Sequence, residues 1–98
     1  MQGAQGDLAA ALTGYRASLA IRERLAAADP GNAGWQRDLA LSFGRVALVK
    51  NTQGAPEDAL ELFGKGRGII VELMRRSSNS AILRQDLAWF ESQIDQLR

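Results

Sequence analysis

The feature that most limits the fold of this chain is an internal repeat with a period of 48 residues. Without a gap, residues 5–40 align with residues 53–88, and ten of these 36 positions are identical. Stacked repeats are copies of one supersecondary unit, so equivalent residues should have equivalent elements. We therefore predict the second half of one unit, a whole unit and the first half of a third, and we expect the chain to be the end of a longer array.

Each half-unit has the three- and four-residue apolar spacing of an amphipathic helix. Stop signals separate the half-units at 29–32 (DPGN), 53–54 (QG) and 77–80 (SSNS). Asn32 is a predicted N-cap, and Pro56 occupies a position typical of the first helical turn. We predict a single all-α domain over residues 1–98, with antiparallel helices at about 7–28, 33–52, 56–76 and 80–97.

A second signature recurs with the repeat. It comprises Gly6, Ala11, Leu12 and Tyr15, repeated as Gly54, Ala59, Leu60 and Phe63. Together with the DPGN break, it resembles the second helix of a tetratricopeptide repeat. The period of 48 exceeds that family's 34, and the excess corresponds to about two extra turns in each helix. The resemblance implies a long-helix variant of an α-solenoid that binds proteins or peptides.

The stretch FGKGRGII at residues 63–70 allows several interpretations. Its alternating glycines could form a phosphate-binding loop, and RGIIVEL could form a strand. However, the 48-residue shift aligns Gly64, Gly66 and Gly68 with the middle of a predicted helix. We therefore predict that residues 62–72 are helical, with Gly66 at the small-residue position that the resemblance implies at a helix crossing.

Composition argues against several classes of function. Lys and Arg total 12 against 11 Asp and Glu, so the chain lacks the net charge that favours nucleic acid or membrane partners. It has no cysteine and no histidine, and we interpret Glu57, Asp58 and Glu61 as a solvated helix start. Neither a signal peptide nor a membrane span is recognisable. We expect a cytoplasmic protein that is not an enzyme and has no cofactor or metal.

Four apolar residues lie outside the stripes of three- and four-residue spacing that we assign to the core of the predicted helices. They are Leu41 and Leu48, seven apart, and Ile82 and Trp89, also seven apart. The resemblance implies that first helices line one groove, which would gather these residues with Trp89 as the anchor. The predicted rim consists of Arg37, Arg45, Asn51 and Gln85. Such aligned apolar residues indicate an interaction surface, although a missing helix, a terminus or a second copy could also cover them.

The helix predicted at 7–28 raises a separate expectation. It is the second helix of its repeat unit, and no first helix of that unit precedes it to cover its apolar face. We predict a homodimer with four residues at or near the contact, namely Leu8, Leu12, Tyr15 and Leu19. The sequence as a whole predicts a non-catalytic interaction or scaffold module that binds a protein or peptide. A self-association module and a regulatory fragment of a larger enzyme are the alternatives.

Overall fold

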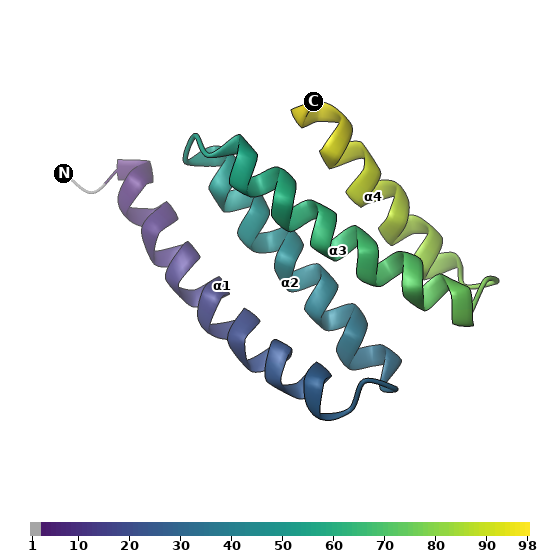
Figure 1. The fold of residues 1–98 in the computed structure, drawn as a ribbon. Coiled ribbons are helices and arrows are strands. Elements are labelled where there is room, and N and C mark those ends of the chain that lie inside the picture. Colours follow the sequence, from purple (N-terminus) through teal and green to yellow (C-terminus); the bar gives the residue numbers. More distant parts are fainter. Residues whose placement is uncertain (1–2) are drawn as a thin grey trace.

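The computed structural model describes residues 3–98, with side chains from Gly6 onward. Four α-helices account for nearly all of this part, which contains no strand: α1 (Gly3–Ala28), α2 (Ala33–Thr52), α3 (Pro56–Arg76) and α4 (Ala81–Leu97). Each helix runs antiparallel to the one before it, with α1 and α4 at the two outer edges (Figure 1). The predicted all-α class and four helices are confirmed.

The helix ends follow from local chemistry that recurs with the repeat. The Asn32 side chain accepts a hydrogen bond from the Trp35 amide at 3.0 Å, and Ser80, its repeat equivalent, accepts one from the Leu83 amide at 3.2 Å. These caps satisfy amides that have no partner within the helix. Between α2 and α3, Gly54 has a φ of 85°, which L side chains rarely adopt.

The first helix begins at Gly3, four residues earlier than predicted. The repeat explains the difference, because Leu8 in α1 corresponds to Pro56, the residue that begins α3. Proline has no amide hydrogen and disfavours a helical residue before it, whereas leucine allows the helix to continue. The fourth helix begins at Ala81 rather than 80, because Ser80 serves as its cap.

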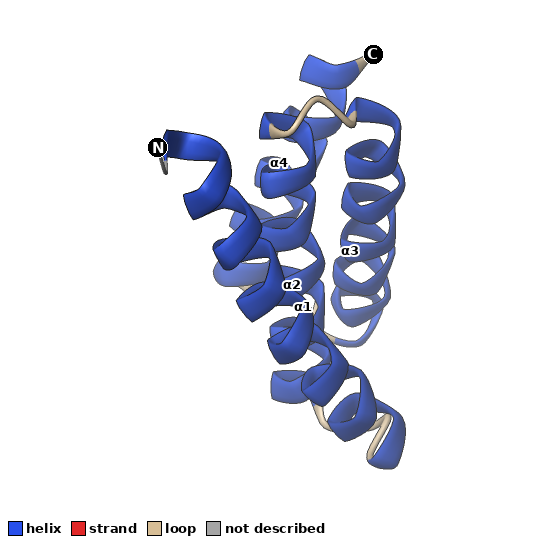
Figure 2. Ribbon diagram, turned by 90° about the vertical axis from the view of Figure 1, so that its left-hand side faces the viewer, coloured by secondary structure: helices blue, strands red, loops and turns tan. Residues whose placement is uncertain are grey.

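The core lies where α3 packs against both α2 and α4, and Figure 2 shows α3 to one side of these two helices. Its largest fully buried side chains are Phe63, Ile70 and Phe90. Alanines fill the remaining space, because Ala40, Ala47 and Ala59 are completely buried. The narrowest extent of the fold is only 19 Å, about two helix diameters.

The glycine-rich stretch 63–70 lies inside α3, so the loop and strand interpretations were wrong and the helical prediction is confirmed. Gly66 is the buried member of the three glycines. A methyl group on it would lie 2.4 Å from Cε1 of Phe90 and 3.0 Å from the Ala40 carbonyl oxygen. Neither Gly64 nor Gly68 has such a neighbour within 4 Å. Glycine at 66 therefore allows the three helices to approach closely, as predicted.

Candidate functional site

A bidentate ion pair joins α2 to α4. The Arg37 Nε donates to Asp86 Oδ2 at 2.6 Å, and its Nη2 donates to Oδ1 at 3.2 Å. The hydrogen bond to Asp86 raises the pKa of Arg37 above its ordinary value, against the opposing effect of desolvation. Charge-assisted bonds in this paired geometry fix orientation as well as contributing energy. The pair therefore sets how α2 and α4, the first helices of their repeat units, lie relative to each other.

Trp89 of α4 lies against the backbone of α2. A methyl group on Gly44 would be 2.9 Å from the indole Cζ3, so this glycine provides the space for the ring. The indole also meets Phe63 and Phe90 edge-on, with centroid separations of 5.7 and 5.1 Å. Even so, 37% of Trp89 is exposed. One side of the indole is anchored in the core while solvent reaches the rest.

Two of the remaining predicted groove residues share a face of α2 with Gly44, the glycine against which the indole lies. Gly44 follows Leu41 by three residues and precedes Leu48 by four, so the three positions share one face of α2. Leu41 is half-buried, Leu48 is 39% exposed and Ile82 is 55% exposed. We use the term α2–α4 face for Leu41, Leu48, Ile82 and Trp89. Ile82 and Leu48 border two different hollows, and neither hollow is lined by Leu41 or Trp89.

Those two hollows are small, and each has a cation at its edge. Ile82 borders one of about 310 Å³, together with Arg37 and Arg76. Leu48 borders another of about 160 Å³, together with Arg45 and Tyr15. Neither Arg45 nor Arg76 forms an ion pair with any residue that the structure describes. Two arginines that have no ion-pair partner among the described residues therefore lie beside Ile82 and Leu48.

The predicted rim residues differ in whether their side chains already have a partner within the chain. Arg45, Asn51 and Gln85 are exposed. Arg37 instead has its guanidinium held by Asp86. This ion pair could not be predicted from the sequence, because Asp86 lies 49 residues from Arg37 in the chain. A rim cation that already has a carboxylate attracts a second one much less strongly.

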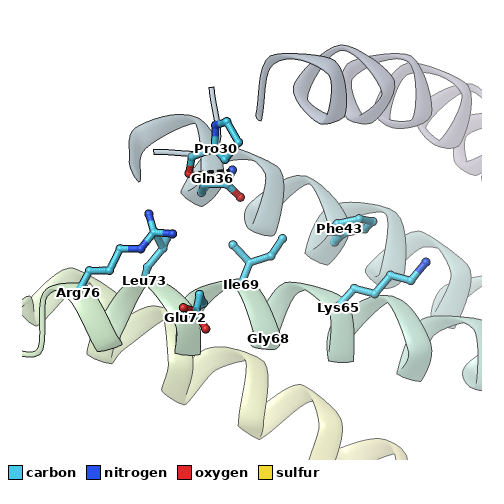
Figure 3. Close-up of a pocket in the computed structure, with 9 residues that line it drawn as sticks. All are labelled: Pro30, Gln36, Phe43, Lys65, Gly68, Ile69, Glu72, Leu73 and Arg76. Atoms are coloured by element: carbon cyan, nitrogen blue, oxygen red, sulfur yellow. Dashed lines mark hydrogen bonds between the residues drawn. The ribbon is translucent and has the colours of Figure 1, made fainter. Parts of the chain in front are cut away.

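Sequence reasoning missed the hollow on another side of α2, which measures about 530 Å³ and is shown in Figure 3. Phe43 and Ile69 line it, and Pro30 and Gln36 lie at one end. Lys65 Nζ lies 5.8 Å from the centroid of the Phe43 ring. Gly68 helps to keep it open by having no side chain. No local pattern in the sequence signals this hollow, because its lining combines Pro30, residues of α2 and residues of α3 that are far apart in the chain.

The residues predicted at a dimer contact lie on the side of α1 that faces α2. Leu8, Leu12 and Leu19 are half-buried, whereas Tyr15 is exposed. Leu8 and Tyr15 border the hollow that also contains Leu48. Arg22 follows Leu19 by three residues on this same side of α1, and it forms an ion pair with Asp38 at 3.7 Å. This side of α1 is thus partly used within the chain.

No group of three or more histidine, cysteine, aspartate or glutamate side chains in residues 6–98 could hold a metal ion. None of the described helices has both the length and the apolarity required to cross a bilayer. No family model, curated protein or solved structure matches the chain. The function therefore has to be inferred from the α2–α4 face itself.

Proposed function

We propose that the protein is a non-catalytic interaction module with a tetratricopeptide-like arrangement, and that its α2–α4 face receives a segment of a partner protein. The observation that carries this proposal is Trp89, held against Gly44 and two phenylalanines yet still partly open to solvent. A rigid, half-exposed aromatic side chain is typical of residues that anchor interfaces. Exposed Leu48 and Ile82 extend the apolar surface on either side of it.

The rigidity of this face supports binding by a preformed surface. The Arg37–Asp86 pair fixes α4 on α2, and the aromatic contacts of Trp89 limit the rotation of its ring. An interface whose side chains are ordered beforehand loses less conformational entropy on association. The face therefore needs little rearrangement to accept a partner.

The charges on this surface indicate the chemistry of the occupant. Arg45 and Arg76 have no acidic partner within the described residues and border the hollows next to Leu48 and Ile82. The segment that fits best is amphipathic, with apolar side chains for Trp89 and its neighbours and carboxylates near its ends. Exposed charges affect association rate and salt sensitivity more than affinity, so the apolar residues should dominate binding.

The proposal can be tested by selecting peptides from a random 15-residue display library on the intact protein. We expect enriched peptides to combine apolar and acidic residues. Trp89→Ala should weaken their binding about thirtyfold or more, which corresponds to about 2 kcal/mol for an anchoring aromatic. Because Trp89 also packs on Phe63 and Phe90, this variant should lose some stability, and circular dichroism must verify its fold.

Two further variants separate binding from folding. Leu48→Glu and Ile82→Glu change exposed side chains, so they should remain folded while losing peptide binding. Ala27→Glu is the control, because it places the same charge on an exposed apolar residue of α1 that belongs neither to this face nor to the apolar side of α1 that packs on α2. If the selected peptides bind Leu48→Glu and Ile82→Glu as tightly as the parent, the α2–α4 face is not the binding site.

A further inference from the structure

The repeat provides an internal template for what should cover α1. Its equivalent, α3, is covered on two sides. Towards α4, Phe63 meets the ring of Phe90 and Arg67 pairs with Glu91 at 3.0 Å. Towards α2, Gly66 approaches the Ala40 carbonyl, and Ile69 and Leu73 border the hollow that Phe43 lines. As the second helix of its repeat unit, α3 thus has two helical neighbours.

Only one of these two sides is covered in α1. The side that corresponds to the α4-facing side of α3 packs on α2, where Arg22 pairs with Asp38 and Gln36 donates to the Ala26 carbonyl. The residues equivalent to Gly66, Ile69 and Leu73 are Ser18, Ile21 and Leu25. Ile21 is 50% exposed, and Leu25 is also exposed whereas Leu73 is buried. The second side of α1 therefore has apolar residues without a neighbouring helix among residues 3–98.

The uncovered side carries a continuous apolar stripe, in which three- and four-residue steps link every member. We call it the α1 stripe, and it consists of Ala10, Gly14, Ala17, Ile21, Leu25 and Ala28. All six residues are exposed. The stripe is asymmetric, because small residues occupy its first half and the two large residues lie in its second half. A methyl group on Gly14 would meet nothing within 4 Å, so there is room beside it.

The open side of α4 does not complement this stripe. In α2, the residues directed towards α3 include Ala40, Phe43 and Ala47, and their equivalents in α4 are Ala88, Glu91 and Asp95. Two acidic residues thus replace apolar ones. Asp95 is exposed, whereas Glu91 is half-buried in its ion pair with Arg67 of α3. Repeat arrays commonly end in a polar outer face of this kind. Head-to-tail stacking of α4 of one copy on α1 of the next would bury these carboxylates against leucine and isoleucine.

We infer that a second copy of the chain covers the α1 stripe through its own α1, related by a twofold axis. In the antiparallel arrangement, an axis between Ala17 and Ser18 places Ile21 opposite Gly14 of the partner subunit. It also places Leu25 opposite Ala10 of the partner subunit. Each large side chain then faces a small one, and both contacts occur twice because the interface is self-complementary. The small residues at the axis permit the close approach that Gly66 permits in α3.

Charge does not oppose this association. The chain has a net charge of only +1, so two copies repel each other weakly. The antiparallel orientation also places the positive end of each helix dipole beside the negative end of the other. The α1 stripe is separate from the α2–α4 face, so the dimer leaves that face free and is independent of the proposed function.

Sedimentation and cross-linking of the intact chain test the inference. We expect the parent to sediment as a dimer at high micromolar concentration and Ala17→Glu to sediment as a monomer. Ala20→Glu is the matched control, because it places the same charge on another exposed alanine of α1 outside the stripe. Since the chain has no cysteine, Ala17→Cys should form a disulfide-linked dimer under mild oxidation, and Ala20→Cys should do so at least tenfold more slowly.

Each outcome decides for or against the inference. A parent that stays monomeric at high micromolar concentration overturns it. A dimer that persists equally in Ala17→Glu and Ala20→Glu also overturns it, because the contact then lies on another surface. Circular dichroism of both glutamate variants verifies that α1 remains helical. Loss of the dimer in Ala17→Glu alone, with rapid cross-linking of Ala17→Cys, supports the antiparallel arrangement.

Discussion

The helices α1 and α3, each the second helix of its repeat unit, have related sequences but different environments. Phe63 of α3 is completely buried, whereas its equivalent in α1, Tyr15, is 39% exposed. Ile70 is buried, and its equivalent Arg22 is half-exposed and paired with Asp38. The difference arises because α3 packs extensively on two helices, whereas within the described residues α1 packs extensively on α2 alone.

This comparison shows that a repeated pattern specifies a capacity for burial rather than burial itself. The hydrophobic contribution scales with the apolar area that is removed from water, so identical leucines contribute differently in α1 and α3. Equivalent positions in the two helices should therefore respond differently to the same substitution. Phe63 and Tyr15 are such a pair, two glycines compare a covered and an open side within α3, and Asp86 and Asp38 are equivalents in α4 and α2. All measurements require a concentration at which the chain has one oligomeric state.

The largest difference is expected between Phe63→Ala and Tyr15→Ala. Phe63→Ala removes a fully buried ring that contacts Trp89 and Phe90, and it should lower the free energy of unfolding by about 3–5 kcal/mol. Tyr15→Ala removes an exposed ring at the equivalent position, and its effect should be about 1 kcal/mol or less. Urea denaturation measures both values. Equal losses would show that α1 is covered as completely as α3.

The glycines of α3 should give effects of opposite sign. Gly66→Ala forces a methyl group against Phe90 and the Ala40 carbonyl, so we expect a loss of about 1–3 kcal/mol despite the better helix propensity of alanine. Gly64→Ala should gain about 0.5–1 kcal/mol, because its methyl group meets nothing within 4 Å. Thermal unfolding can resolve this difference. A stabilised Gly66→Ala variant would contradict the close packing of the three helices.

The smallest difference is expected between the repeat equivalents Asp86 and Asp38. Asp86→Asn weakens a bidentate pair in which only 12% of the aspartate side chain is exposed, and it should lower stability by about 1.5–3 kcal/mol. Asp38→Asn affects a longer, solvent-exposed pair and should change stability by about 1 kcal/mol or less. Urea denaturation of both variants provides the comparison. Equal effects would mean that the pair between α2 and α4 does not fix their arrangement.

The sequence was sufficient for the helices because their signals are local. Asn32, Pro56 and Gly54 determine where helices begin and end through the geometry of a few neighbouring residues. The small residue at position 66 could also be predicted, since the resemblance to a tetratricopeptide repeat implies a small residue at that helix crossing. The start of α1 was misplaced because Leu8 replaces the proline that limits α3, and a leucine gives no boundary signal.

The candidate site could be predicted only in part. The seven-residue spacings identified Leu41, Leu48, Ile82 and Trp89 as residues outside the core stripes, and three of them are exposed. The support of Trp89 by Gly44 could not be predicted, because it depends on how closely two helices 45 residues apart approach each other. The same limit applied to Arg37, whose partner became evident only from the distance between α2 and α4.

The sequence by itself determined four helices, their caps and an apolar face on each, because helix formation depends on spacings of three and four residues and on short-range hydrogen bonds. Only the tertiary structure decided which faces are covered. Leu25 and Leu73 occupy equivalent positions in equivalent helices, yet one is exposed and the other is buried. Burial depends on which helix lies alongside. That contact joins residues far apart in the chain, and the local spacing of apolar residues does not specify it.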